Sequence, residues 1–111
     1  MKRIEVIISL EIEGTHCWPE CPFEDVAFLR DAHRHIFTIC ATKEVTHDDR
    51  DVEIILLKRK VESWIQAKYG KPASFGTMSC EQIGKALLEH FDLSSCEVLE
   101  DNENGAKITA L

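Results

Sequence analysis

The chain has 111 residues, enough for one domain (residues 1–111), and its 44% hydrophobic and 30% charged composition is typical of a soluble globular protein rather than a disordered segment. A formal net charge of −7 argues against nucleic-acid binding through a basic face, and no stretch approaches the roughly 18 apolar residues that cross a membrane. The residues after Met1-Lys2-Arg3 include glutamates, unlike the apolar run of a signal peptide, so we expect a cytoplasmic protein without nucleic-acid or membrane partners.

The first half of the chain predicts two long strands joined by a loop. Residues 3–13 predict a half-buried strand, because apolar side chains occupy every second position: Ile4, Val6, Ile8, Leu10 and Ile12. Residues 14–31 predict a loop, since Pro19 and Pro22 cannot donate hydrogen bonds within a central strand. The alternation resumes over residues 33–46, where one face carries Phe37, Ile39, Ala41 and Val45.

The second half predicts two helices followed by a hairpin. Residues 52–69 carry one apolar stripe at helical spacing (Ile54, Leu57, Val61, Trp64 and Ile65), and Gly70-Lys71-Pro72 ends this helix. Ser79-Cys80-Glu81-Gln82 has the form of a capping box and opens a second helix, whose inward residues are Ile83, Ala86, Leu87 and Phe91. Residues 95–110 read as strand, turn and strand, with the turn at Asn102-Glu103-Asn104-Gly105.

This order, β-β-α-α-β-β, predicts an α+β fold in which two helices cover one face of a four-stranded antiparallel sheet. Such a sheet has two open edges, and the first two strands are long. Edge pairing between subunits would cover the unpaired backbone groups, so we expect a homo-oligomer.

The five cysteines are an odd number and contain no CxxC pair, so we do not expect a disulfide framework. Cys40, Cys80 and Cys96 fall within predicted strands or a helix. Each is therefore interpreted as a small buried side chain.

Three histidines could meet at one end of the sheet. His33 and His35 are two residues apart on one strand, so they project to the same side as Phe37. Counting by twos along the first strand from Ile12 places His16 on the corresponding face. Three imidazoles with an open fourth position describe a catalytic zinc site, although other borderline metals suit the same ligands. The alternative is that these histidines are ordinary polar residues of a turn.

The order of these motifs resembles the family of 6-pyruvoyl-tetrahydropterin and 6-carboxy-tetrahydropterin synthases, which have the tunnelling fold. The matching residues, in order, are His16, His33 and His35, then Asp51-Val52-Glu53-Ile54, then Ser79-Cys80-Glu81, and finally Glu100. The chain is short for this family and is similar to small phage-type relatives of it.

The resemblance implies that His16, His33 and His35 bind zinc, which polarises oxygens on the side chain of a reduced pterin precursor. It implies that Glu100 anchors the guanidine-like edge of the ligand through charge-assisted hydrogen bonds, with Glu81 as a second substrate-binding residue. It also implies a ring-shaped oligomer with the ligand site between neighbouring subunits. Without the resemblance, Glu100 would be interpreted as an exposed carboxylate at a strand end.

The proton-handling groups depart from the family pattern. The family's cysteine lies four residues before the H-x-H motif, and that position is Leu29 here. Cys21 could fold back from the loop to replace it, whereas Cys17 would point away from His16 in a continuous strand. The family's Asp-His relay between the helices is also missing. His47 with Asp48 has the right chemistry, but the alternative is that this segment is a turn before the first helix.

Two functions follow from these residues. The first is a zinc-dependent lyase or synthase acting on a pterin or 7-deazaguanine precursor, with Cys21 or His47 and Asp48 transferring protons. Because Leu29 replaces the family cysteine, the alternative is a non-catalytic binding protein for a pterin, purine or modified nucleotide. A third possibility is a ring-forming scaffold with surface histidines.

Overall fold

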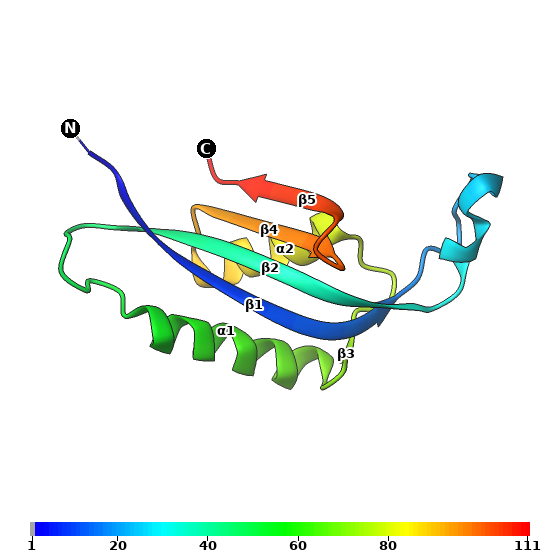
Figure 1. Ribbon diagram of the computed structural model, residues 1–111, viewed down its shortest axis with the longest axis horizontal. Helices are drawn as coiled ribbons and strands as arrows, with labels where there is room; N and C mark the ends of the chain where they lie inside the picture. The colour runs from blue at the N-terminus through cyan, green and yellow to red at the C-terminus, as the bar shows by residue number, and fades with distance from the viewer. Residues whose placement is uncertain (1) are drawn as a thin grey trace.

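The structure is a computed structural model that describes residues 2–111, and it consists of one twisted sheet with two α-helices on one face (Figure 1). The strand order is β3-β1-β2-β4-β5. The elements, in chain order, are β1 (Ile4–His16), a 3-10 helix (Glu24–Arg30), β2 (His33–Val45), α1 (Ile54–Tyr69), β3 (Ala73–Ser74), α2 (Cys80–Phe91), β4 (Ser95–Glu100) and β5 (Asn104–Thr109). The α+β fold predicted from the sequence is therefore present.

The core lies between the sheet and the two helices. Strands β1 and β2 pair antiparallel over their whole length, from Ile4 opposite Val45 to His16 opposite His33. Side chains at alternate positions of these strands and of β4 face the helices and are buried: Ile8, Leu10, Phe37, Ile39, Ala41, Cys96 and Val98. Removal of each of the larger of these side chains (Ile, Leu, Val and Phe) from water contributes about 1.5–3 kcal/mol, which makes this face the main source of stability.

The prediction of four antiparallel strands is wrong by one strand. The fifth strand, β3, contains only Ala73 and Ser74 and pairs parallel with Gly14 and Thr15 of β1. Two residues carry no hydrophobic period, so the sequence pattern could not reveal this strand. Gly14 permits the pairing, because a Cβ at this position would lie 3.0 Å from the carbonyl oxygen of Ala73.

The β4–β5 turn also differs from the prediction. Asp101 and Asn102 carry the positive φ angles, 53° and 57°, whereas Asn104 and Gly105 already belong to β5. Gly105 serves close packing instead, because a Cβ there would lie 1.8 Å from the carbonyl oxygen of Val98. The prediction of a hairpin here is confirmed, but the predicted position of its turn is wrong, because Asn104-Gly105 lies in the strand that follows the turn.

The helix ends agree closely with the sequence. Ser79 caps α2 by accepting a hydrogen bond from the Gln82 amide, and the Gln82 side chain accepts one from the Ser79 amide, which completes the predicted capping box. Gly70, at a φ of 92°, ends α1. Helix α1 begins two residues later than predicted, because Glu53 is its N-cap and accepts a hydrogen bond from the Leu56 amide. Within residues 2–111, neither α-helix combines the length and the apolar character needed to cross a membrane.

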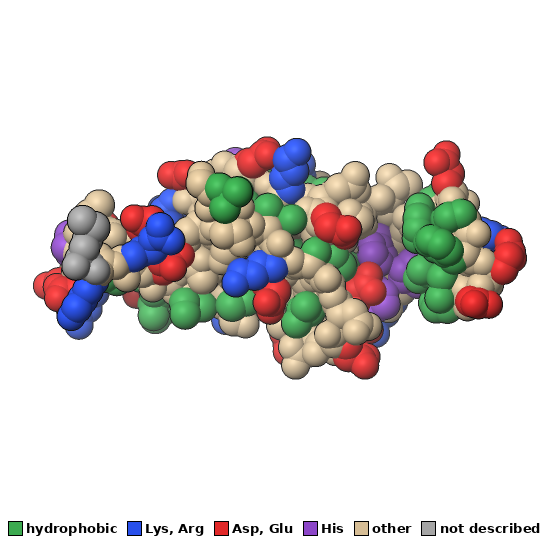
Figure 2. All heavy atoms as spheres, turned by 90° about the horizontal axis from the view of Figure 1, so that it is seen from above, with side chains coloured by type: hydrophobic (Ala, Val, Ile, Leu, Met, Phe, Trp, Pro, Cys, Tyr) green, Lys and Arg blue, Asp and Glu red, His purple; other side chains and the backbone are tan. Residues whose placement is uncertain are grey.

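The segment between β1 and β2, residues 17–32, projects from one end of the molecule and is called the arm below (Figure 1). The loop predicted here contains the 3-10 helix, and its first residues instead belong to β1, which continues to His16. The arm exposes Trp18, Phe23 and Phe28. Seen from above, histidine side chains gather between the apolar arm and the body of the molecule (Figure 2).

Candidate metal centre

The three predicted histidine ligands converge at the end of the sheet next to the arm. His16 is the last residue of β1 and lies opposite His33, the first residue of β2, while His35 lies opposite Gly14. The ring centroids are 4.5 Å apart for His16 and His33, 5.0 Å for His33 and His35, and 5.4 Å for His16 and His35. The argument from strand parity therefore placed all three side chains correctly.

Each histidine is fixed through its Nδ1 atom. Nδ1 of His16 lies 2.8 Å from the carbonyl oxygen of Met78, and Nδ1 of His33 lies 2.9 Å from that of Asp31. Nδ1 of His35 lies 2.7 Å from Oδ2 of Asp101. Because carbonyl and carboxylate oxygens accept hydrogen bonds, each Nδ1 carries a proton and donates it. In a neutral ring this leaves Nε2 as a bare acceptor, which is the arrangement of metal-binding histidines.

The three Nε2 atoms are buried and have no hydrogen-bond partner. Glu100, at the end of β4, adds a carboxylate to them: its Oε2 lies 2.9 Å from Nε2 of His16 and its Oε1 lies 3.6 Å from Nε2 of His35. The ligand atoms of the four residues all lie within 4.8 Å of one another. Three imidazole nitrogens and one carboxylate oxygen fit zinc or a similar divalent metal.

The aromatic ring of Phe37 lies beneath the histidine side chains. Phe37, which is fully buried, has its ring centroid 5.2 Å from that of His16 and 5.6 Å from that of His35, both edge-on. Phe75 packs on the other side of Phe37 at 5.0 Å. The histidines thus stand on the rigid end of the core, which limits how far their rings can move.

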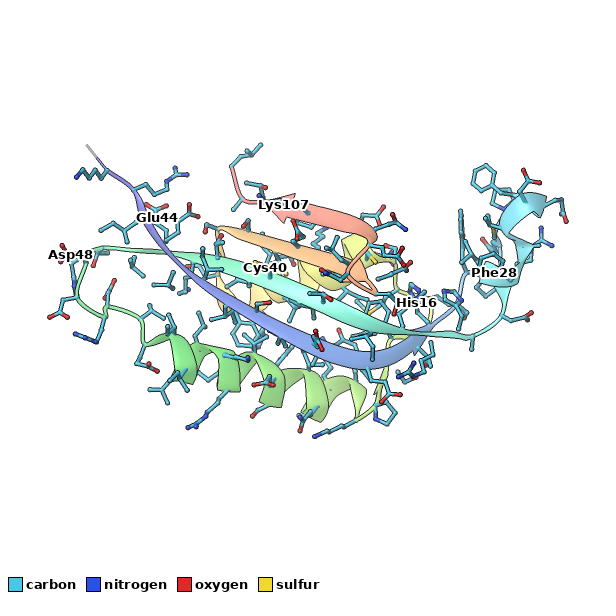
Figure 3. All side chains as sticks on the ribbon, in the orientation of Figure 1. His16, Phe28, Cys40, Glu44, Asp48 and Lys107 are labelled. Carbon is cyan, nitrogen blue, oxygen red and sulfur yellow. The ribbon has the colours of Figure 1, made fainter. Side chains whose placement is uncertain are left out.

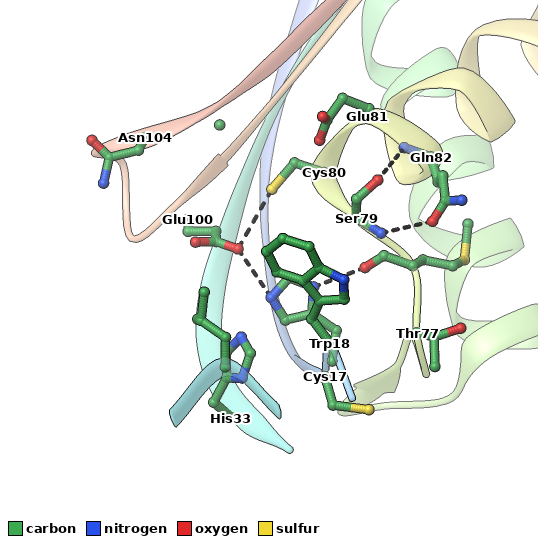
Figure 4. Close-up of a pocket in the computed structure, with 14 residues that line it drawn as sticks. Cys17, Trp18, His33, Thr77, Ser79, Cys80, Glu81, Gln82, Glu100 and Asn104 are labelled. Carbon is green, nitrogen blue, oxygen red and sulfur yellow. Dashed lines mark hydrogen bonds and ion pairs between the residues drawn. The ribbon is translucent and has the colours of Figure 1, made fainter. Parts of the chain in front are cut away.

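A cavity of about 620 Å³ adjoins three of the four residues, His16, His33 and Glu100 (Figure 4). It lies between the arm, the segment before α2, the first turn of α2 and the β4–β5 turn. Besides His16, His33 and Glu100, its lining comprises Cys17, Trp18, Leu29, Thr77, Met78, Ser79, Cys80, Glu81, Gln82, Asn104 and Gly105. Its volume suits a ligand the size of a fused two-ring heterocycle.

The cavity is lined by the thiols of Cys17 and Cys80 and not by that of Cys21, which the sequence had suggested. Cys21 is buried within the arm, where its Sγ lies 3.7 Å from the carbonyl oxygen of Phe23, and it does not line the cavity. The amide of Cys21 donates to the carbonyl oxygen of Trp18, and this tight turn directs Cys21 into the arm. Cys17, which was expected to point away from His16, lines the cavity instead.

Cys80 was not recognised as a site residue from the sequence. Its Sγ lies 3.7 Å from Oε2 of Glu100, and burial, together with the carboxylate of Glu100, raises the pKa of the Cys80 thiol to about 12. The available signal was its position directly after the cap residue Ser79, next to Glu81, which also lines the cavity. Cys80 and Cys96 are buried as expected, whereas Cys40 is only half-buried.

His47 and Asp48 are not brought to this site within the chain. They follow β2 at the end opposite His33, as the labels of His16 and Asp48 in Figure 3 show. The 13 residues of β2 separate the two ends by roughly 40 Å. The segment is a turn held by Asp51, whose Oδ2 accepts hydrogen bonds from the amide and hydroxyl of Thr46. Leu29, in contrast, lines the cavity.

Comparison with solved structures defines the class of fold. The chain superimposes over its whole length on 6-pyruvoyl tetrahydropterin synthase from Caenorhabditis elegans, with a TM-score of 0.71, 10% identity and 98% of that chain covered. It is also similar to an uncharacterized protein, WS1659, from Wolinella succinogenes, with a TM-score of 0.74, 10% identity and full coverage of both chains. No protein-family model and no curated protein matches the sequence. The chain therefore has a 6-pyruvoyl tetrahydropterin synthase-like fold.

Proposed function

We propose that this protein is a metal-dependent protein that binds zinc through His16, His33 and His35 and acts on a pterin or a 7-deazaguanine precursor. One observation carries the proposal: three buried Nε2 atoms without hydrogen-bond partners converge while each Nδ1 is held by an oxygen. Leaving three buried acceptors unpaired is costly, on the order of 1–3 kcal/mol each. A divalent metal would satisfy all of them together.

The cavity supplies groups suited to a flat, nitrogen-rich ligand. Zinc, when bound, would act as a Lewis acid toward a substrate oxygen. Trp18 offers an aromatic face at the arm side, and Glu81 and Glu100 offer carboxylates that accept the N–H groups of a guanidine-like edge. The Cys80 thiol, whose pKa is raised to about 12, is a neutral proton donor beside Glu100.

The second candidate is capture of a pterin, purine or modified nucleotide without turnover. Leu29 favours it, because this side chain lines the cavity at the position where the resemblance expects a cysteine and it cannot exchange a proton. The assignment of Cys21 as a proton-transfer residue would require the arm to refold. Assignment of His47 and Asp48 would require a neighbouring subunit to bring them to the cavity.

A ring-shaped homo-oligomer is part of the proposal. The outer edge of β1 is paired only at Gly14 and Thr15, and β5 forms the other edge of the sheet. Pairing between copies would cover both edges. Ile7 on β1 is 61% exposed and would lose contact with water on such pairing. We also propose a cytoplasmic location and a pterin or purine-like small molecule as partner; the net charge of −7 argues against a nucleic-acid partner.

Metal analysis tests the first candidate. Protein purified without a histidine tag should contain close to one zinc per chain, and His33→Ala should lose most of it. His47→Ala is the matched control, because it removes an exposed histidine at the other end of β2. Absence of stoichiometric metal in the parent protein, after incubation with zinc and desalting, would refute the proposed centre.

Ligand binding separates the two candidates. A pterin, deazapurine or guanine nucleotide that binds the folded state should raise the melting temperature, and at equal concentration a tighter ligand should raise it more. If chromatography shows that the protein consumes the same compound, the protein is an enzyme. A stabilising compound that is recovered unchanged would indicate a binding protein.

A further inference from the structure

We infer that Glu100 is a fourth ligand of the metal, so that the resting centre is a closed site of three histidines and one glutamate rather than an open site of three histidines. This inference rests on the proposed metal centre. It differs from the role of substrate anchor that the resemblance gives to Glu100. A closed site also determines how a substrate gains access to the metal.

The distance between Glu100 and His16 supports direct coordination. Oε2 of Glu100 lies 2.9 Å from Nε2 of His16, yet Nε2 has no hydrogen-bond partner, so the two atoms are close without being aligned for a hydrogen bond. Ligand atoms bound at about 2.1 Å to one metal in a tetrahedral site lie roughly 3.4 Å apart, with their lone pairs directed at the ion rather than at each other. The distances from Glu100 to His16 and to His35, 2.9 Å and 3.6 Å, lie on either side of this separation.

Protonation of His16 does not explain the arrangement equally well. An imidazolium at His16 would attract the carboxylate, but it would leave Nε2 of His33 and of His35 without a partner. Protonating a second ring as well would place two positive charges beside one carboxylate. One divalent cation instead balances the carboxylate and satisfies all three nitrogens at once.

Glu100 is also held in position by the residue that follows it. Asp101 uses one carboxylate oxygen to accept from Nδ1 of His35 at 2.7 Å and the other to accept from the amide of Ile36 at 2.9 Å. The amide of Asp101 donates to the carbonyl oxygen of Ile36 at 2.8 Å. Three hydrogen bonds thus fix the start of the β4–β5 turn to β2, and Glu100 lies where β4 enters this turn.

A closed site changes the expected course of ligand binding. A substrate oxygen can reach the metal only by replacing Glu100 or by increasing the number of ligands. While it is bound through one oxygen, Glu100 can offer a heterocycle only its second oxygen, so Glu81 is the acid with both oxygens available to an incoming ligand. Asp101 acts as a positioning residue for both Glu100 and His35.

The test uses untagged full-length protein, stripped of metal and refilled with Zn²⁺ or Co²⁺. Calorimetric titration with Zn²⁺ should show that Glu100→Gln binds at least about 100-fold more weakly than the parent protein. The visible absorption of bound Co²⁺, which depends on the number and type of ligands, should change in position and intensity. Glu81→Gln is the matched control, because it makes the same change of charge in the same cavity and should alter neither measurement.

The outcomes are distinguishable from failure of the proposed function. If His33→Ala loses the metal while Glu100→Gln retains parental affinity and the parental Co²⁺ spectrum, the centre stands and the inference is overturned. If the parent protein itself does not bind metal, both fail. Should Glu100→Gln not fold, as judged by circular dichroism, Glu100→Asp provides the comparison: an altered Co²⁺ spectrum supports coordination and an unchanged spectrum contradicts it.

Discussion

His35 donates its Nδ1 proton to Asp101 across 2.7 Å, and this bond joins the beginning of strand β2 to the β4–β5 turn. Its acceptor is charged, because hydrogen bonds from the Ile36 amide and from His35 hold the pKa of Asp101 below the ordinary value for aspartate. A carboxylate partner fixes the ring and makes Nε2 a stronger ligand. The bond therefore bears directly on metal affinity.

Asp101→Asn should weaken zinc binding by about 10- to 100-fold without unfolding the protein. Asparagine tolerates the positive φ of 53° at this position, but it has one acceptor oxygen where Asp101 uses two, so the change removes the charge and one of the bonds from His35 and the Ile36 amide. Competition with a zinc-sensitive dye would measure the effect. Asp25→Asn, an exposed change on the arm, is the control, and equal affinities for the two variants would contradict the prediction.

Gly105→Ala should destabilise the protein by more than about 2 kcal/mol, because the new Cβ would lie 1.8 Å from the Val98 carbonyl oxygen and the backbone of β4 must shift. Gly84→Ala is the contrasting variant. Its Cβ would lie 3.2 Å from a side-chain atom of Ile108, which can move, and alanine favours the helix. Urea unfolding of the metal-free forms compares them, and similar losses would show that the β4–β5 contact is less tight than described.

Acid should weaken the metal-free protein partly through Asp51. Hydrogen bonds from the amide and hydroxyl of Thr46 lower the pKa of Asp51 in the folded state. A lowered folded pKa means that this contribution is fully present above the unfolded value, about 3.9, and is lost as the pH falls through the folded pKa. Asp51→Asn should therefore be less stable near neutral pH and should show a shallower decline in acid.

Urea midpoints measured from neutral pH to about pH 3, in the presence of a chelator, would test the prediction for Asp51. Asp48→Asn is the control, since Asp48 is exposed in the same turn. Parallel pH profiles for the parent protein and Asp51→Asn would contradict the assignment.

Trp18→Ala should weaken any heterocyclic ligand found for the cavity by about 1–3 kcal/mol, the range for stacking of a base on an aromatic ring. Trp18 lines the cavity and is 44% exposed, so its removal should cost little stability. Phe28→Ala, on the same arm but outside the cavity lining, should leave binding unchanged. Titration calorimetry with the best ligand from the thermal screen would compare the two variants.

The sequence predicted those features that arise from local patterns. Alternation revealed both long strands, and the same parity placed His16 with His33 and His35. The capping box at Ser79 was readable because its two hydrogen bonds lie within four residues. The order of the motifs agreed with the fold, although only the superposition, at 10% identity, established the fold.

Features that depend on contacts between distant segments were missed. The pairing of β3 with β1 has no periodic signal, and the contact between Cys80 and Glu100 joins a helix start to a strand end. Cys21 was preferred because Cys17 would point away from His16 in a continuous strand, whereas Cys21 could fold back from the loop. The arm is instead ordered by its own hydrogen bonds, among them that from the Arg30 side chain to the carbonyl oxygen of Cys21, so the two thiols have the opposite placement.

The arm lies between two of the proposed ligands, because His16 ends β1 and His33 begins β2. A metal bound by both would cross-link the two ends of this segment, much as a disulfide closes a loop. Since the entropy of closing a loop depends only weakly on its length, insertions or deletions in the arm should be tolerated as long as the ion is bound. The outer part of the arm is then free to change its length, whereas Asp31, whose carbonyl oxygen holds His33, must keep its place.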